Sequence, residues 1–271
     1  MAEYFVEHFS NIFDFVSAIK SRPDTGHAGN AAKDNKESFG GMSLDKAYEC
    51  VHTGLPEVSS ELKRELVKFT TSNVGYLPKR MPSNYYYGHA PNVPAAIIGL
   101  PKAMRRITNV PQKVKTIKFF YNNVANSNTK KEILEKAGAC VLKLVQLAEV
   151  NGYRVEFDLI DYLAVKDSYN AICTINLKQY GQPLDILKLS FPLTSVSMFR
   201  RLGFRWLETM PTLKGDWSVT YGRSIDHKDD AMSKLSEAGV DLRNAYYISV
   251  PMCKDADFDP YKLAKQLEIN L

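Results

Sequence analysis

This protein has 271 residues, 45% of them hydrophobic, and a formal net charge of +5, which is an ordinary composition for a globular protein. No run of about 18 apolar residues occurs, so we expect no membrane-spanning helix. The N-terminal sequence lacks the basic start and long apolar stretch of a secretory signal. The four cysteines are far apart in the sequence, and we expect reduced thiols in a cytoplasmic protein.

Small polar residues that can cap a helix precede three periodic apolar stretches in the first third of the chain. Ser10 precedes the first stretch, and Ser43 precedes the second, which Gly54 ends. Between them, residues 21–42 are rich in Gly, Asn and Lys and predict a flexible loop. The predicted helices span residues 11–20, 43–54 and about 59–72.

The next segment combines positive charge with proline. From Leu66 to Lys131 the chain has eleven lysines and arginines and no Asp or Glu. Six of the thirteen prolines lie in residues 75–111, so we expect mostly extended chain, with at most short helices near residues 95–98 and 102–106. A long irregular segment is often functional. The alternative is a connection that wraps around the core.

The second half of the chain alternates strands and helices. A strand at 114–121, a long helix from Thr129 to about Val150 and a strand at 153–162 form a βαβ-like unit. We therefore predict an α+β (mixed α/β) fold over residues 1–271, in one domain, with a central mixed sheet and a long crossover helix. Further strands are predicted at 171–177 and 244–250, and further helices at 195–207, 229–238 and 260–271.

Aromatic residues lie among the cations of the basic segment. Exposed rings offer stacking platforms for unpaired bases, and cations neutralise phosphates, so this pattern predicts binding of single-stranded DNA. The alternative is a solvated basic face with buried tyrosines. Side chains alternate along an extended chain, so either Tyr86 or both Tyr85 and Tyr87 should be exposed. The candidate DNA-binding residues here are Tyr76, Lys79, Arg80, Tyr85, Tyr86, Tyr87, Lys102, Arg105, Arg106, Lys113, Lys115 and Lys118.

A second basic patch lies in residues 199–206. Helical spacing would place Arg201 and Arg205 on one side, beside Arg200. These three arginines could extend a strand-binding groove, or they could simply face water on an amphipathic helix.

No pattern for catalysis or cofactor binding occurs, so we expect no enzyme, no catalytic residue and no cofactor. Residues 226–230 contain His227 and three acids, which is more typical of a polar helix start than of a metal site. Asn123, Ala125 and Ser127 take the positions of a metal-dependent adhesion motif but supply no carboxylate. We expect no bound metal.

Several phrases together resemble a domain family of unknown function found mainly in tailed bacteriophages. The resemblance implies a viral protein in the host bacterial cytoplasm. Within such phages it implies a transcription cofactor that binds melted promoter DNA and recruits an RNA polymerase. The implied partners are single-stranded DNA and a phage-encoded RNA polymerase, with no membrane; a homo-oligomer is possible. The phrases are Phe-Asp-Phe-Val at 13–16, Pro-Asn-Val-Pro-Ala-Ala-Ile-Ile-Gly-Leu-Pro-Lys-Ala-Met at 91–104, the strand before Asn123 with Gly-Ala-Cys-Val-Leu-Lys-Leu-Val at 138–145, Gly-Tyr-Arg-Val at 152–155, Gly-Gln-Pro-Leu-Asp at 181–185 and Met-Phe-Arg-Arg-Leu-Gly-Phe at 198–204.

A different function stays open. The chain could be a non-enzymatic phage structural or host-interaction protein whose basic surface docks an acidic protein partner.

Overall fold

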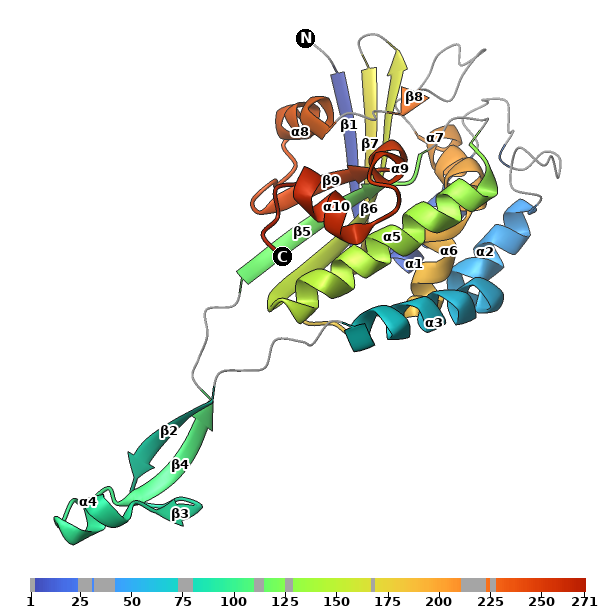
Figure 1. Cartoon of the computed structure of the whole chain (residues 1–271). Coiled ribbons are helices and arrows are strands. Elements are labelled where there is room, and N and C mark those ends of the chain that lie inside the picture. Colours follow the sequence, from blue (N-terminus) through green and yellow to red (C-terminus); the bar gives the residue numbers. More distant parts are fainter. Residues whose placement is uncertain are drawn as a thin grey trace.

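The structure is a computed structural model that describes residues 3–23, 31, 42–72, 80–109, 115–124, 129–166, 169–210, 223–224 and 228–271. Its main sheet has the strand order β1-β7-β6-β5-β9, with the short strand β8 beside β6 (Figure 1). The strands are β1 (Glu3–Phe9), β5 (Lys115–Asn122), β6 (Tyr153–Lys166), β7 (Tyr169–Lys178), β8 (Arg223–Ser224) and β9 (Ala245–Ser249).

The centre of this sheet is the predicted strand–helix–strand unit. The long helix α5 (Lys131–Val150) leads from β5 to its parallel neighbour β6, and β7 returns antiparallel to β6. β9 pairs parallel to β5 on the other side, and β1 pairs parallel to β7 at one edge. Phe119 lies opposite both Phe157 and Tyr246, in the middle of this register. The mixed α+β fold is therefore confirmed.

The helices begin and end near where capping residues predict. Ser43 accepts a hydrogen bond from the backbone of Lys46 at the start of α2, and Gly54 ends it with a φ of 66°. At α1 the cap is Asn11, not Ser10, because the Asn11 side chain accepts from two backbone N–H groups. The helices besides α5 are α1 (Ile12–Ser21), α2 (Leu44–Thr53), α3 (Pro56–Ser72), α4 (Val93–Ile97), α6 (Ile186–Thr194), α7 (Phe204–Glu208), α8 (Lys228–Glu237), α9 (Val250–Asp255) and α10 (Pro260–Gln266), and a π-helical segment, η2, spans Met198–Gly203.

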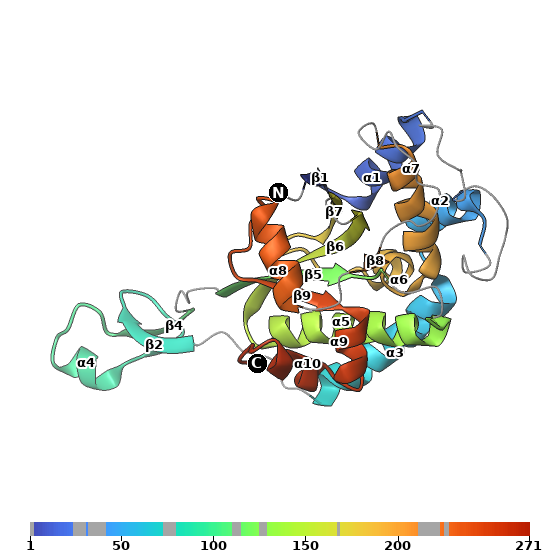
Figure 2. The same cartoon turned by 90° about the horizontal axis from the view of Figure 1, so that it is seen from above.

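The two faces of the sheet are covered unequally. On one face, side chains such as Phe119 and Phe157 pack into a large core with residues from α1, α2, α3, α5, α6, α9 and α10. On the other face, Phe120 and Ile160 pack with Leu235 of α8 in a small cluster. Figure 2 shows α5 and α8 on opposite sides of the sheet. Successive side chains of a strand point to opposite faces, and β5 has apolar residues at both odd and even positions, so it is buried on both faces.

A second, small sheet forms inside the basic segment. It consists of β2 (Arg80–Tyr85), β4 (Met104–Asn109) and β3 (Ala90–Pro91), in the antiparallel order β2-β4-β3, with α4 between β3 and β4. Figure 1 shows it standing apart from the main sheet and its helices, instead of wrapping around the core. We call residues 80–109 the arm and the rest of the described chain the body.

Several elements differ from the sequence-based expectation. No helix forms at residues 102–106, where at most a short one was expected, because residues from Met104 onward pair with β2 as a strand. The helical segment expected at residues 195–207 is confirmed, although part of it is the π-helical η2, which precedes α7. β1, α6 and α9 were not expected at all. The loop expected at 21–42 lies mostly outside the described residues, and the expectation of a single domain stays a prediction.

Candidate nucleic-acid interface

A tight turn shapes the arm. In β2, Tyr85 lies opposite Met104 and Asn84 opposite Arg105, and beyond the turn Ala90 lies on the other side of Arg105. The chain between these two pairings passes close to β4 at Gly88. A Cβ atom at Gly88 would lie 2.1 Å from the carbonyl oxygen of Arg105, so only glycine fits there.

Three consecutive tyrosines lie at this turn, and all three are exposed. The exposed fractions are 38% for Tyr85, 64% for Tyr86 and 61% for Tyr87. The ring of Tyr85 contacts both neighbours edge-on, with centroid distances of 6.4 Å to Tyr86 and 5.4 Å to Tyr87. The alternative of buried tyrosines therefore does not hold for these residues.

Two cations lie against these rings. The guanidinium carbon of Arg106 is 5.2 Å from the ring centre of Tyr85 and 5.0 Å from that of Tyr87, and one of its nitrogens donates to the Tyr87 hydroxyl at 2.8 Å. The ammonium of Lys102 lies 5.5 Å from the ring centre of Tyr86. Each such contact contributes about 0.5–1 kcal/mol at an exposed site. The arm thus presents rings and cations on one continuous surface.

No carboxylate balances this charge within the arm. Its sequence contains Arg80, Lys102, Arg105 and Arg106 and neither Asp nor Glu. Arg105 is exposed, and its side chain makes no ion pair with any described residue. The sequence-based candidates Tyr76, Lys79 and Lys113 lie outside the described residues, as does the side chain of Arg80.

The family model named "Domain of unknown function (DUF7192)" matches residues 2–267, the arm included. This chain belongs to the DUF7192 family. No curated protein and no solved structure matches the chain. Membership therefore assigns no activity, and any function for this DUF7192 protein has to be argued from its own residues.

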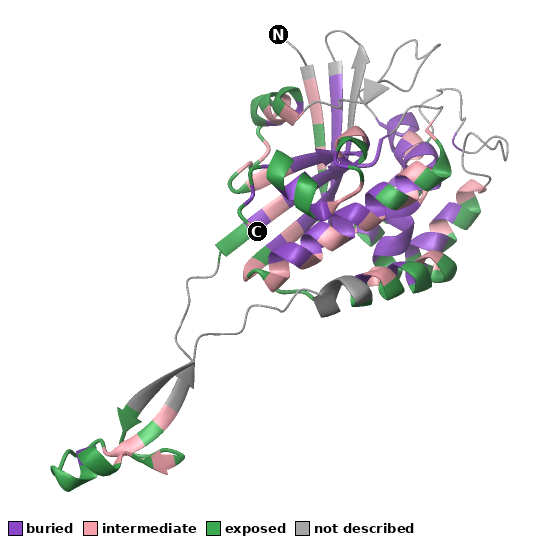
Figure 3. Ribbon diagram, in the orientation of Figure 1, coloured by how far each residue is buried: buried purple, intermediate pink, exposed green. Residues whose placement is uncertain are grey.

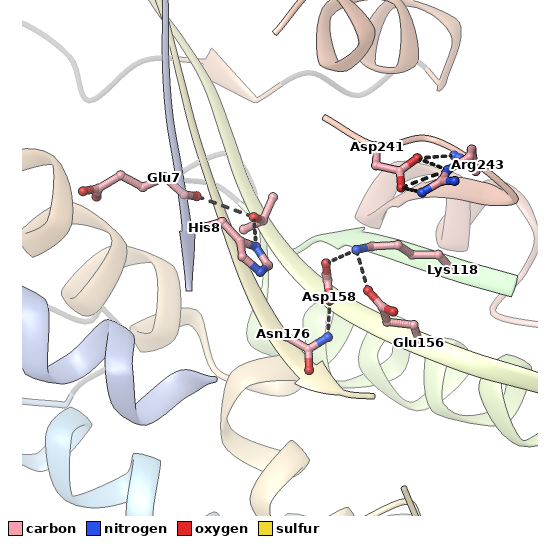
Figure 4. A network of polar contacts seen from close by, with 9 residues as sticks. Glu7, His8, Lys118, Glu156, Asp158, Asn176, Asp241 and Arg243 are labelled. Atoms are coloured by element: carbon pink, nitrogen blue, oxygen red, sulfur yellow. Dashed lines mark hydrogen bonds and ion pairs between the residues drawn. The ribbon is translucent and has the colours of Figure 1, made fainter. Parts of the chain in front are cut away.

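Two of the candidate lysines belong to β5 in the body. Lys115 is exposed at the start of the strand, with its ammonium 5.3 Å from the ring centre of Tyr153. Lys118 lies on the thinly covered face of the sheet, where it forms ion pairs with Glu156 at 2.6 Å and Asp158 at 2.7 Å (Figure 4). Lys118 is therefore already neutralised by two carboxylates.

The same polar network shows how this sheet face tolerates charge. Burial raises the pKa of Asp158, and the neighbouring Lys118 opposes that rise. Burial alone would lower the pKa of Lys118, but Asp158 and Glu156 raise it overall. Asn176 donates to Asp158 at 2.6 Å and completes the set. Each charge of this network has a partner within it, so the network accounts for how these charges pack on this face of the sheet.

The second basic patch does not form a surface, which corrects the sequence-based expectation. Arg200 and Arg201 are buried, with exposed fractions of 7% and 1%. Arg201 donates through Nε to the carbonyl of Met42 at 2.7 Å and through a terminal nitrogen to that of Ala31 at 2.8 Å. Burial also lowers the pKa of Arg200. Arg205 is half-buried and lines a cavity of about 600 Å³ with residues of α1 and α2.

The residues considered as possible metal ligands form no cluster within the described ranges. Asn123 is buried and donates to the carbonyl of Pro192 at 3.0 Å, whereas Ala125, Ser127 and His227 lie outside the described residues. Within the described ranges, no group of three or more His, Cys, Asp or Glu side chains could hold a metal ion. No described helix is long and apolar enough to cross a membrane. All four cysteines are buried and free.

Two further features of the structure were not expected from the sequence. The end of the arm around α4 exposes apolar side chains, including Ile97 at 79% and Ile98 at 72% (Figure 3). The body contains a fully buried carboxyl group, Asp161, whose pKa burial raises to about 7. The signal for the first was present in the sequence, as an apolar run between prolines in an otherwise basic segment. The strand period puts Asp161 on the same side as Phe157 and Leu159, so its inward direction follows from the sequence, whereas its lack of a hydrogen-bond partner among the described residues does not.

Proposed function

We propose that this protein binds single-stranded DNA through the arm, with little dependence on base sequence. The observation that carries the proposal is the group of three exposed tyrosines, Tyr85, Tyr86 and Tyr87, with Arg106 and Lys102 against their rings. A base stacks on an aromatic face only when it is unpaired, and the adjacent cations neutralise the phosphates beside it. Duplex DNA keeps its bases stacked inside, so it would gain only the electrostatic part of the binding free energy.

Fluorescence anisotropy with labelled oligonucleotides tests this proposal. At equal salt we expect tighter binding to single-stranded than to duplex DNA. If about five cations contact phosphates, log K should fall with log salt at a slope of about −3 to −4, at roughly −0.7 per contact. Equal affinity for both forms of DNA, or a slope near zero, would contradict the proposal.

Variants separate stacking from charge. Tyr86→Ala should weaken binding by about 1–3 kcal/mol, roughly 5- to 150-fold, and leave the salt slope unchanged. Tyr86→Phe keeps the ring and should bind like wild type. Tyr180→Ala removes a tyrosine of the body that is 42% exposed, and so serves as the matched control.

For charge, Lys102→Ala with Arg105→Ala should weaken binding to all sequences alike and flatten the slope by about 1.4, at roughly 0.7 per contact. Lys254→Ala removes an exposed lysine of α9 and should have no effect. If both arm variants fold and bind like wild type, the DNA site does not lie on the arm.

The resemblance to bacteriophage proteins supports a narrower proposal: a non-enzymatic transcription cofactor in the host bacterial cytoplasm. In this role, comparable to that of the podovirus protein Drc, the protein would hold melted promoter DNA and recruit the phage RNA polymerase. Co-purification of the phage polymerase with the wild type, and its release by the arm variants, would support this role. A polymerase that never co-purifies would contradict it.

One observation favours a different function. The exposed apolar residues around α4 have no role in contacting phosphates, and they are typical of a protein-docking surface. A structural or host-interaction protein whose basic arm binds an acidic partner would fail the DNA experiments above and still require this apolar end.

A further inference from the structure

The end of the arm is an apolar tip. It consists of Val93, Ile97, Ile98 and Leu100, with exposed fractions of 56%, 79%, 72% and 48%. Ala95 is the buried residue beneath them, at 4%, so α4 already uses its small inward side chain for packing and turns its large side chains outward. Contiguous exposed apolar residues of this kind mark an interaction site.

The tip is held in shape by the arm. Gly99, with a φ of 72°, ends α4, and the N–H of Leu100 donates back to the carbonyl of Ala95 at 2.9 Å. Asn92 bridges to Asn84 of β2 through its side chain at 3.0 Å. The apolar side chains are therefore presented by an ordered turn, which lowers the entropy that docking costs.

The body carries a groove of matching chemistry along α3 and α5. It consists of two adjoining cavities of about 330 Å³ each, which share Val58 and Glu135. One cavity has the apolar lining residues Leu62, Ala139 and Phe258. The other has Met42, Leu55, Pro56 and Val196.

Glutamates rim this groove. Glu65 pairs with Lys143 at 2.8 Å and Glu135 with Lys131 at 3.4 Å, so these two charges are compensated. Glu57, Glu61 and Glu132 are exposed and form no ion pair with any described residue. Lys136 also lines the groove, is exposed and forms no ion pair with any described residue, so three unpaired glutamates against one unpaired lysine leave the rim net negative around an apolar floor. The tip has the opposite charge. Its apolar side chains are followed in the sequence by Lys102 and Arg105, and the arm contains no Asp or Glu.

We propose that the tip of one copy docks into the α3–α5 groove of a second copy. Ile97 and Ile98 would fill the apolar floor, and Lys102 and Arg105 would meet the glutamates of the rim. The occupant is a second copy because both complementary surfaces belong to this chain, and Figure 1 shows the arm directed away from its own body. Each copy has one tip and one groove, so the contact is head-to-tail and extends to open chains or closes to rings.

The proposal does not depend on DNA binding, and its test contains no DNA. Sedimentation velocity of the full chain should show association that grows with concentration and weakens with salt. A tip variant, Ile97→Asp with Ile98→Asp, and a groove variant, Glu61→Lys with Glu132→Lys, should each raise the dissociation constant about tenfold or more. Asp255→Lys with Glu268→Lys reverses equal charge elsewhere on the body and should associate like wild type.

The decisive measurement mixes the two variants. The tip variant keeps an intact groove and the groove variant keeps an intact tip, so an equimolar mixture should form a one-to-one dimer and stop there. A wild type that stays monomeric, a groove variant that still self-associates through its tips, or a mixture that stays monomeric although both variants keep wild-type circular dichroism spectra would each overturn the proposal.

Discussion

Asp161 makes the stability of the body depend on pH. It lies on β6 opposite Cys173 of β7, on the face that the helices cover. Both carboxylate oxygens are buried, and neither has a hydrogen-bond partner in the part of the chain described. One of them would lie 2.9 Å from a Cβ atom at Gly203, so η2 closes directly over it. An ionised carboxylate in this position loses its hydration without compensation.

The magnitude follows from the pKa. Burial raises the pKa of Asp161 from 3.8 to about 7. Between these values the folded chain holds a proton that the unfolded chain has released, so the free energy of unfolding falls as pH rises, by about 1.4 kcal/mol per pH unit. The stabilisation is complete below pH 3.8 and is lost as pH rises through 7. Over the whole interval the loss is about 4 kcal/mol.

Asp161→Asn removes the ionisation and keeps the shape. Urea unfolding, followed by circular dichroism at about pH 5 and pH 8, measures the effect. Over this range we expect the wild type to lose about 3 kcal/mol more than the variant. Asp241→Asn is the control, because Asp241 is exposed and its neighbour Arg243 lowers its pKa to about 2, outside the range. Equal pH dependence of wild type and Asp161→Asn would refute the reasoning.

Three further outcomes follow from local contacts. Arg201→Met removes the guanidinium that donates to the carbonyls of Ala31 and Met42 and should cost about 2–4 kcal/mol in urea unfolding, whereas a loss below about 1 kcal/mol would show that water replaces the guanidinium. Gly88→Ala places a Cβ against the carbonyl of Arg105 and should abolish DNA binding with an unchanged melting temperature of the body; wild-type affinity would show that the turn adapts. EDTA should change neither the melting temperature nor DNA binding, since a lone Asn123 without carboxylates cannot hold a hard cation; a large loss of either would point to a metal site.

The elements that the sequence predicted well are those with a strong, regular pattern. β5, α5 and β6 have long apolar repeats with the period of a strand or a helix, and burial follows that period in the structure. β1 lacks such a signal because Glu7 lies on its inward face. The structure shows why this is tolerated: Arg22 and the indole nitrogen of Trp206 both donate to the Glu7 carboxylate at 2.5 Å. Those partners are distant in sequence, so no local pattern indicates them.

The inward direction of Arg201 has a different cause. Residues 195–207 look helical by composition, and helical spacing puts Arg201 beside Arg205 on an outer face. Arg201 lies within the π-helical segment η2, whose hydrogen bonds span one residue more than those of an α-helix, so α-helical spacing does not give the direction of its side chains. As a result Arg201 points inward, while Arg205 stays half-exposed. α6 was not expected, and it contains Pro192, which lacks a backbone N–H, in its last turn.

The composition of the candidate site was predictable, whereas its geometry was not. Charge counting alone singles out the basic segment, and the alternation of side chains requires that one of three successive tyrosines be exposed. The position of Arg106 between Tyr85 and Tyr87 depends on the register of β2 against β4, and this register depends on the close approach at Gly88. A shift by one residue would turn Arg106 to the other face of the small sheet.

The body and the arm use lysine and arginine in opposite ways. In the body, two lysines of the sheet are matched to carboxylates: Lys178, with its side chain 2% exposed, pairs with Glu149 at 2.6 Å, and Lys118 pairs with two acids. In the arm, Arg106 and Lys102 lie against tyrosine rings, which hold a cation without neutralising it. An aromatic partner therefore fixes the geometry of the charge while the positive field of the arm persists. We expect this arrangement to suit an anionic ligand. Asn84→Asp would place a carboxylate opposite Arg105, supplying an internal partner that the arm sequence lacks, and would lower the positive charge of the arm by one.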